Sequence, residues 1–419
     1  MPIKNIAISN FKTFEEQKIN LEDFNILIGA NSAGKSNFIQ FFKFLRDIVD
    51  FGLNNAIYMQ GGIEYLRNAN LPKNDKSSFQ IDYELPNRGF AIAQKPGYII
   101  ILENPKITYK FILKYRTKSS YEVIEDNLSC IGVIAHLPIQ GNKIDQKNIK
   151  KYEEGKIEII NNTASQRVKV TFTPPQGLKT KIKEKEFFPV FLGSKLKKGE
   201  LLLESSFYIP PLKEFLHRIA IYDFDPRLSK RATQITGKIE LEEDGGNLAS
   251  VLKSILDNTE KRRKFKNYLQ DLLPFVENIR LSRFADRSLL IKTKEIGSNY
   301  LPAPLISDGT INIIALLVVL YFENRELIIL EEPERNIHPF LISKIIDLFK
   351  EASKKKQIII TTHNPEIIRH SDFHDIYLIS RNTARFSEIS RPIEKEKIQK
   401  FLENEIGIDE LYVQNLLGV

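Results

Sequence analysis

One octapeptide near the start of the chain constrains the fold more than any other feature. Residues 29–36 read Gly-Ala-Asn-Ser-Ala-Gly-Lys-Ser and match the phosphate-binding pattern G-x-x-x-x-G-K-[ST] at every fixed position. The apolar run Phe24–Ile28 before it predicts a buried strand, and the apolar-rich segment Asn37–Leu45 after it predicts a helix. Such a strand, loop and helix direct backbone N–H groups and the positive end of a helix dipole at one point. The octapeptide therefore predicts a nucleoside triphosphate site.

The residue types in this loop suit phosphate binding. Glycines at positions 29 and 34 allow the backbone to wrap closely around phosphates. The Lys35 ammonium can reach the β- and γ-phosphates, and the Ser36 hydroxyl can ligate Mg²⁺. No visible motif selects the base, so GTP stays open beside the expected ATP and Mg²⁺. The residues expected to bind the nucleotide are Gly29, Ala30, Asn31, Ser32, Ala33, Gly34, Lys35, Ser36 and Asn37.

Two later aliphatic runs end in residues that can carry out hydrolysis. Leu327–Leu330 predicts a central strand that delivers Glu331 and Glu332 to the edge of the sheet where the phosphate loop lies. From their order, we assign Glu331 to the metal and Glu332 to the attacking water. Gln357–Thr362 predicts another buried strand, and His363 after it is placed to contact the γ-phosphate.

A capped helix is predicted between the loop and these acids. Ser307 precedes the apolar stretch Ile311–Leu320 and is expected to be its N-cap, with backbone N–H groups exposed for an anion. Taken alone, Ser307 and Gly309 fit an ordinary capped helix.

The order of these motifs resembles that of the ABC-type ATPases. More narrowly, the chain is similar to the RecF/SMC/OLD-related, AAA-type bacterial ATPases found in anti-phage and toxin–antitoxin operons. The resemblance implies an α/β fold, with an ABC-type P-loop core, a mixed central sheet flanked by helices, an antiparallel β lobe and a mid-chain α/β insertion. The segments that carry it are residues 6–14, 29–37, 305–310, 327–339 and 361–365.

The resemblance also implies a composite site in a homodimer or a higher even-numbered homo-oligomer. Ser307 and the Gly309 backbone would reach the γ-phosphate bound by the other subunit, while Asn336 and His338 would lie at the dimer seam. Departures from the family pattern are Asp308 in the signature and Glu331 where most ABC ATPases carry Asp. The residues implied to act within their own subunit are Lys35, Glu332 and His363 in catalysis, and Ser36 and Glu331 as metal ligands.

The charge pattern does not decide whether the chain contacts nucleic acid. The net charge is +8, and basic residues gather at 179–185, 195–198, 261–264 and 354–356. Such runs can contact phosphates of DNA or RNA. In a lysine-rich chain they are more often solvated faces.

The composition and the motif spacing set the expected compartment and domains. One cysteine, Cys130, excludes a disulfide framework, and the longest apolar run is too short for a bilayer, so we expect a cytoplasmic protein with no membrane contact. The expected domains are 1–135, with the loop and the β lobe, 136–300, an insertion, and 301–419, with the remaining motifs.

Local patterns give further expectations. The segments 79–85, 98–102 and 107–113 predict antiparallel strands, and Arg280–Lys294 predicts a hairpin. The segment 141–155 predicts an exposed loop or hairpin end. Helix is predicted at Leu212–Tyr222, and two helices between Asn247 and Glu277.

The resulting hypothesis is an ATPase, which converts ATP and water to ADP and phosphate, that works as a nucleotide-gated sensor or switch. It would control a separately encoded effector, a nuclease or toxin, in anti-phage defence. The residues after His363 are too few for the TOPRIM nuclease domain of OLD proteins. The alternative is a RecF-like DNA-binding ATPase of DNA repair. The sequence does not reveal the effector, the trigger or the assembly beyond a dimer.

Overall fold

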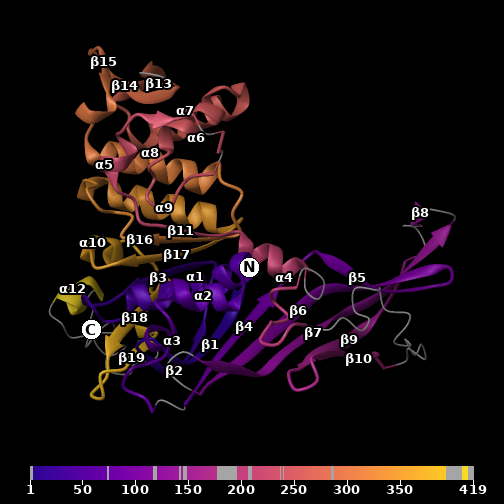
Figure 1. Cartoon of the computed structure of the whole chain (residues 1–419). Coiled ribbons are helices and arrows are strands. Elements are labelled where there is room, and N and C mark those ends of the chain that lie inside the picture. Colours follow the sequence, from indigo (N-terminus) through magenta and orange to yellow (C-terminus); the bar gives the residue numbers. More distant parts are fainter. Residues whose placement is uncertain are drawn as a thin grey trace. The chain divides into compact units, whose positions relative to one another are not determined.

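The computed structural model divides into two compact units whose segments alternate along the chain. The first, the β unit, comprises Met1–Glu22, Ser36–His217 and Arg381–Glu388. The second, the α/β unit, comprises Asp23–Lys35, Arg218–Ser380 and Ile389–Val419. Figure 1 labels the elements of both. The structure describes residues 3–72, 75–116, 120–140, 143–144, 149–176, 196–205, 210–235, 237–238, 240–284, 287–392 and 408–413.

A parallel sheet forms the centre of the α/β unit. Its strand order is β11-β16-β17-β3-β18, with β19 at the edge, and neighbours along β11 to β18 are parallel. β3 and β17 are buried along their whole length, and each contains three consecutive aliphatic residues, as is typical of parallel sheets covered on both faces. The bounds are β3 (Phe24–Ile28), β11 (Ile219–Tyr222), β16 (Leu327–Glu331), β17 (Gln357–Thr362), β18 (Ile376–Arg381) and β19 (Ser387–Ser390).

Two helices supply much of the core beside this sheet. Every residue of α8 (Asp308–Tyr321) from Thr310 to Leu320 is buried, and α9 (Ile342–Ser353) buries Ile345, Ile346 and Phe349. In Figure 1 both helices lie on the same side of β16 and β17. The unit's other elements are α5 (Pro226–Ser229), β12 (Thr233–Gln234), α6 (Leu248–Leu256), α7 (Thr259–Leu272), β13 (Val276–Phe284), β14 (Ser288–Glu295), β15 (Tyr300–Pro302), η4 (Ala303–Leu305), η5 (Pro339–Leu341), α10 (Pro365–Arg369), η6 (Phe373–Asp375) and α12 (Ile408–Val413).

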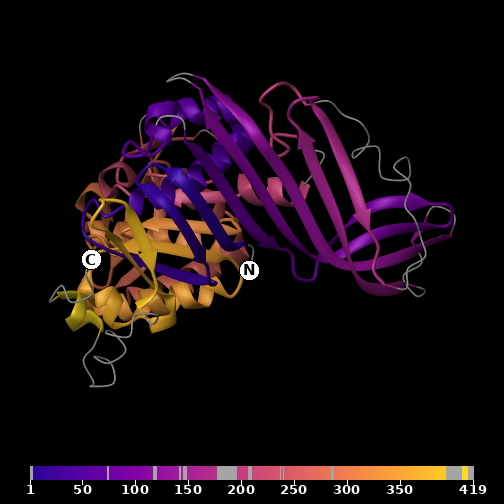
Figure 2. The same ribbon diagram turned by 90° about the horizontal axis from the view of Figure 1, so that it is seen from below.

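A long antiparallel sheet dominates the β unit. Over the described residues it has nine strands, in the order β10-β9-β7-β6-β4-β1-β2 with β5 and β8 alongside. Figure 2 shows the long purple and magenta strands running side by side. Phe11, Phe44 and Phe79 form a buried aromatic cluster, in which Phe11 stacks on Phe44 and meets Phe79 edge to face. The bounds are β1 (Ile3–Phe11), β2 (Phe14–Asn20), β4 (Lys76–Glu84), β5 (Gly89–Lys95), β6 (Tyr98–Tyr115), β7 (Tyr121–Gln140), β8 (Lys143–Ile144), β9 (Lys150–Asn162) and β10 (Arg167–Thr173), with helices α1 (Lys35–Phe51), α2 (Leu53–Met59), α3 (Ile63–Leu66) and α4 (Pro210–His217).

These elements confirm the predicted α/β class with an antiparallel β lobe. The predicted strands next to the phosphate loop and the acids are β3, β16 and β17, and the predicted pair of helices and hairpin are α6, α7, β13 and β14. The division into domains 1–135, 136–300 and 301–419 stays a prediction. The basic run at 179–185 and Lys195 lie outside the described residues.

Three local predictions were wrong. The helix predicted over Leu212–Tyr222 ends at His217, and β11 follows it as a fully buried strand. The segments 98–102 and 107–113 belong to one strand, β6, whose register shifts between Glu103 and Lys106. The segment 141–155, predicted as an exposed loop or hairpin end, is strand β9 from Lys150 onward, and residues 141, 142 and 145–148 lie outside the described residues.

Candidate nucleotide-binding site

The phosphate loop connects β3 to α1, as predicted. The Lys35 Nζ donates hydrogen bonds to the backbone oxygens of Gly29, at 2.6 Å, and Ala30, at 3.1 Å, so the ammonium lies against the loop. Gly29 cannot carry a side chain, because a Cβ there would lie 2.3 Å from the backbone oxygen of Ile379 on β18. Strand pairing therefore fixes where the loop leaves the sheet.

The other predicted loop residues differ in exposure. Ala30, Asn31, Ser32 and Ser36 are exposed, whereas Ala33 and Gly34 are buried, Gly34 with a φ of 125°. Asn37 is half-buried, and its side-chain amide donates to the Thr13 hydroxyl at 2.9 Å within the β unit. Residues 30–32 are therefore exposed, while the Asn37 side chain is held by Thr13.

Glu331 and Glu332 follow one another at the end of β16. Glu332 has a φ of 44°, in the left-handed region, and its backbone N–H donates to the Thr361 oxygen at 2.9 Å. Such a conformation costs a non-glycine residue about 1 kcal/mol, and residues that adopt it cluster at functional sites.

The Glu332 carboxylate is part of a chain of ionic hydrogen bonds. Its Oε1 lies 2.8 Å from His363 Nδ1, and its Oε2 accepts from Arg335 Nη2 at 3.0 Å. Arg335 Nη1 in turn donates to Asp223 Oδ1 at 3.2 Å. Residues from the ends of β11, β16 and β17 thus meet at one edge of the sheet.

These contacts set the charge of the site. Burial of Glu332 acts to raise the pKa of its carboxyl, but the Arg335 hydrogen bond and the charges of His363 and Arg335 lower it overall. Burial lowers the pKa of Lys35, against the opposing effect of the Glu332 and Glu331 carboxylates. Glu332 is therefore an ionised carboxylate at neutral pH, close enough to Lys35 for the two charges to interact.

A second carboxyl beside this site is buried. Glu334 is 5 % exposed, and its Oε1 accepts a short hydrogen bond from the Thr362 hydroxyl. Its Oε2 has no partner among the described residues. Burial raises the pKa of Glu334, so it is more easily protonated than Glu332, two residues away.

The predicted signature residues lie at the start of α8. Ser307 is the N-cap, as predicted, and its hydroxyl accepts from the Thr310 N–H at 3.1 Å. A Cβ at Gly309 would lie 2.4 Å from the Asn336 oxygen, and Asn312 Nδ2 donates to the Arg335 oxygen at 2.6 Å. The first turns of α8 thus pack directly on the loop that follows Glu332.

Four residues near the site were missed by the sequence analysis as parts of it: Arg335, Asp223, Glu334 and Lys230. Lys230, after α5, forms a close ion pair with Asp308, next to Ser307. Arg335 follows Glu332 by three residues, a signal that could have been used. Asp223 and Lys230 lie far away in sequence, and only the fold brings them to their partners.

His338, which was predicted to lie at the dimer seam, is the N-cap of η5, and its ring Nδ1 accepts a hydrogen bond from the Phe340 N–H.

Residues 24–112 and 189–369 match the protein family described as "AAA domain, putative AbiEii toxin, Type IV TA system". The chain belongs to this family. Membership confirms the resemblance to AAA-type bacterial ATPases and the expectation that the chain is an ATPase.

The individual relatives are similar either at low identity over the whole chain or over a short stretch only. The sequence is 22% identical to an ATP/GTP phosphatase of Helicobacter pylori (strain ATCC 700392 / 26695) over 418 residues, covering 96% of this chain and 98% of the relative. A stretch of 60 residues, 14% of this chain, is 43% identical to the endonuclease GajA of Bacillus cereus (strain VD045). The chain spans only 10% of that endonuclease.

Solved structures of similar shape include SMC heads. An SMC head bound to the C-terminal winged-helix domain of ScpA is 16% identical, with a TM-score of 0.46, covering 93% of this chain and 97% of that one. The Thermotoga maritima SMC head is 14% identical, with a TM-score of 0.43, covering 93% of this chain and 99% of that one.

Within the described parts of the present chain, no helix is both long and apolar enough to span a membrane.

Proposed function

We propose that the chain binds and hydrolyses ATP at the loop of residues 29–36 and acts as a nucleotide-gated switch for a separate effector. The observation that carries the proposal is the Glu332–His363 pair, 2.8 Å apart, whose carboxylate also acts electrostatically on Lys35. Membership of an ATPase family and full-length similarity to an ATP/GTP phosphatase support hydrolysis.

The residues present fit Mg²⁺. Among the described residues, no group of three or more His, Cys, Asp or Glu side chains is arranged to hold a metal. Magnesium does not need one, because it binds through one or two protein oxygens, water and phosphate oxygens. The Ser36 hydroxyl and the Glu331 carboxylate would hold it. When bound, Mg²⁺ would supply positive charge opposite the β- and γ-phosphates.

The protein side chains would then divide the chemistry. Glu332, ionised and held by Arg335 and His363, would orient the attacking water and accept its proton. Because His363 Nδ1 lies against Glu332, Nε2 is the nitrogen that would contact the γ-phosphate. Lys35 would neutralise charge on the β- and γ-phosphates, and the exposed backbone N–H groups at residues 30–32 would bind their oxygens.

We further propose that two copies of the chain share each nucleotide. Ser307 and the Gly309 backbone would reach the γ-phosphate bound by the other subunit, with Asn336 and His338 at the seam. The packing of α8 on the loop 335–337 supports this arrangement, because a movement at the signature would reach Glu332 directly. Ser307→Arg tests it: bound ATP with lost hydrolysis is expected, and unchanged turnover would contradict the shared site.

The switch would act on a separately encoded nuclease or toxin in the cytoplasm during anti-phage defence. The family's toxin–antitoxin description supports this setting. Co-purification of the Glu332→Gln variant with the product of the neighbouring gene, with and without ATP and Mg²⁺, tests it. We expect nucleotide-dependent capture, and a neighbour with neither nuclease nor toxin activity that never co-purifies would contradict it.

A DNA-binding ATPase of repair is the second candidate. The observation in its favour is α7, where Lys261, Arg262, Arg263 and Lys264 are all exposed. DNA affinity that falls steeply between low and moderate salt, together with DNA-stimulated hydrolysis, is the expected behaviour of this candidate. Absence of binding at low salt would exclude it.

A further inference from the structure

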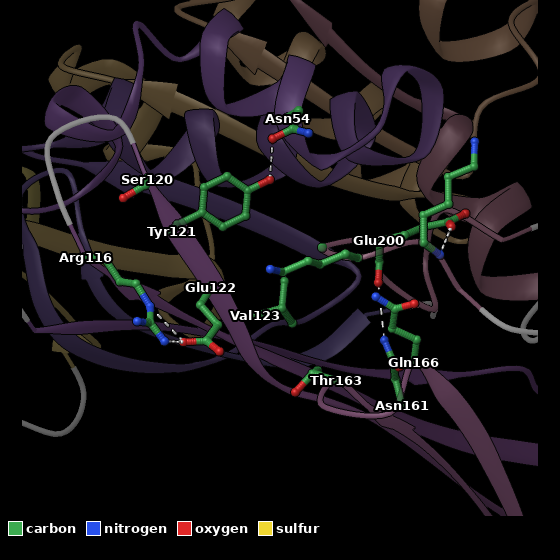
Figure 3. A pocket seen from close by; sticks show the side chains of 13 residues that line it. Asn54, Arg116, Ser120, Tyr121, Glu122, Val123, Asn161, Thr163, Gln166 and Glu200 are labelled. Carbon is green, nitrogen blue, oxygen red and sulfur yellow. Dashed lines mark hydrogen bonds and ion pairs between the residues drawn. The ribbon is translucent and has the colours of Figure 1, made fainter.

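A polar cavity of about 570 Å³ opens in the β unit, within a single compact unit that contains none of Glu332, His363 or Ser307. Figure 3 shows its walls, made by α2, the start of β7, the end of β9 and the turn 197–200. Its lining is almost entirely polar, and Val123 is the one aliphatic side chain among its described lining residues. Such a lining favours a ligand rich in hydrogen-bonding groups.

One residue that lines this cavity, Asn161, carries an unpaired acceptor. Asn161 is 6 % exposed, and its Nδ2 donates to Asp126 Oδ2 at 2.9 Å and to the Glu200 backbone oxygen at 3.2 Å. Both partners are acceptors, so they fix which way the amide faces. The remaining atom, Oδ1, has no partner among the described residues. A buried oxygen of this kind costs free energy unless something donates to it.

Asp126, which accepts a hydrogen bond from Asn161, is itself held by further hydrogen bonds. Asp126 is fully buried, and its carboxylate also accepts from the Leu202 N–H and from the Tyr109 hydroxyl, both at 2.8 Å. The amide is therefore held in place before any ligand arrives, as a preorganised site requires.

The cavity is lined by both basic and acidic side chains. Three basic side chains face two acidic ones, but Arg116 and Glu122 form an ion pair at 2.6 Å, and the Glu200 carboxylate accepts from the Lys197 backbone N–H at 2.7 Å. Lys197 and Lys198 are exposed and form no ion pair within the described residues, although the charge of Lys198 helps to lower the pKa of Glu122. A lysine ammonium is a compact positive charge that binds phosphate.

We propose that this cavity binds a small phosphorylated ligand that also carries hydroxyl or amino donors, a nucleotide or a sugar phosphate. The ammonium groups of Lys197 and Lys198 would bind the phosphate, and a donor of the sugar or base would reach Asn161 Oδ1. This second ligand site lies outside the phosphate loop and goes beyond the proposed ATPase function.

Calorimetric titration of the full chain tests the proposal. The Lys35→Ala background reduces nucleotide binding at the phosphate loop. The probes are adenosine 5′-monophosphate, ribose 5-phosphate and inorganic phosphate, which separate base, sugar and phosphate recognition. The variants are Lys197→Ala/Lys198→Ala and Asn161→Ala, with circular dichroism to establish folding. Lys106→Ala/Lys169→Ala is the matched control, because it removes two exposed lysines of the same unit that do not line the cavity.

We expect the nucleotide or the sugar phosphate to bind at least tenfold more tightly than inorganic phosphate. The Lys197/Lys198 double variant should lose at least tenfold in affinity, and the control should bind like the parent. Equal loss in both double variants would overturn the proposal, as would binding of none of the probes. Binding of an oligoglutamate peptide in place of all three would assign the cavity to an acidic protein segment instead. Since the Lys197/Lys198 variant keeps Asn161, it decides the matter even if Asn161→Ala does not fold.

Discussion

Glu332 Oε1 and His363 Nδ1 lie 2.8 Å apart although 31 residues separate them in sequence. Parallel pairing of β16 with β17 in the register Glu331 to Thr361 brings the two strand ends together at one edge of the sheet. Arg335 contacts the other oxygen of the same carboxylate at 3.0 Å. The proposed general base is thus positioned from both sides and kept ionised, which is what proton abstraction at neutral pH requires.

Replacing this carboxylate should separate binding from chemistry. Glu332→Gln is expected to keep ATP affinity within a few-fold and to lower hydrolysis on the order of 100-fold or more, since the amide cannot accept a proton. Phosphate release and equilibrium ATP binding measure the two effects. Glu295→Gln, on the hairpin strand β14, is the control and should behave like the parent. Hydrolysis at the parental rate by the Glu332→Gln variant would remove Glu332 from the role of base.

The Arg335 contact should set the acid limb of the pH–rate profile. The Arg335 hydrogen bond lowers the pKa of Glu332, so Arg335→Ala should raise it and move the acid limb of kcat/KM to higher pH. Arg369→Ala, an exposed arginine on α10, should leave the profile in place. An unmoved acid limb in Arg335→Ala would show that Glu332 does not determine it.

Ser307 can be compared with another helix cap of the same unit. Ser307 caps α8 and Asn258 caps α7 through the same type of side-chain acceptance. In each alanine variant, the free energy of unfolding measured with urea should fall by about 1 kcal/mol. If Ser307 also binds the γ-phosphate of the other subunit, only Ser307→Ala should lower ATP turnover, by about tenfold. Equal turnover in both variants would reduce Ser307 to a structural cap.

Asp126 should make the stability of the β unit depend on pH. Burial raises the pKa of its carboxyl in the folded state to about 6, against the opposing hydrogen bonds from Asn161, Leu202 and Tyr109. The folded protein therefore holds this proton more tightly than the unfolded chain, whose value is about 3.9. The stabilisation is complete below pH ~4 and is lost as the pH rises through about 6.

Urea unfolding of the parent and Asp126→Asn at pH 4 and pH 7 measures this effect. Between these values, the parent should lose about 2 kcal/mol relative to the variant. A difference between parent and variant that does not change with pH would mean that Asp126 has an ordinary pKa when folded.

The sequence predicted the centre of the site because each of its strands contains a run of three or four consecutive aliphatic residues. β3, β16 and β17 are buried throughout or nearly so, and the motifs at their ends fall where the parallel sheet places them. β11 was missed because Ile219–Tyr222 is a short apolar run next to a helix, and periodicity cannot distinguish a buried strand from a buried helix.

The partners of the site residues were harder to predict, because they depend on tertiary packing. Asp223 reaches Arg335 only after β11 pairs with β16. Lys356, in a basic run that suggested a solvated face, donates to the backbone oxygen of Glu323 at 2.9 Å, and burial lowers its pKa to about 8. Neither contact has a signal in local sequence.

The mass of the purified Glu332→Gln variant in solution, with and without ATP and Mg²⁺, tests the central claim most directly. If two copies share each nucleotide and hydrolysis separates them, this variant should be trapped as a dimer or a larger even-numbered assembly when ATP is present. Ser307→Arg combined with Glu332→Gln should stay monomeric. A Glu332→Gln variant that binds ATP and keeps the same mass with and without it would contradict the nucleotide-gated switch.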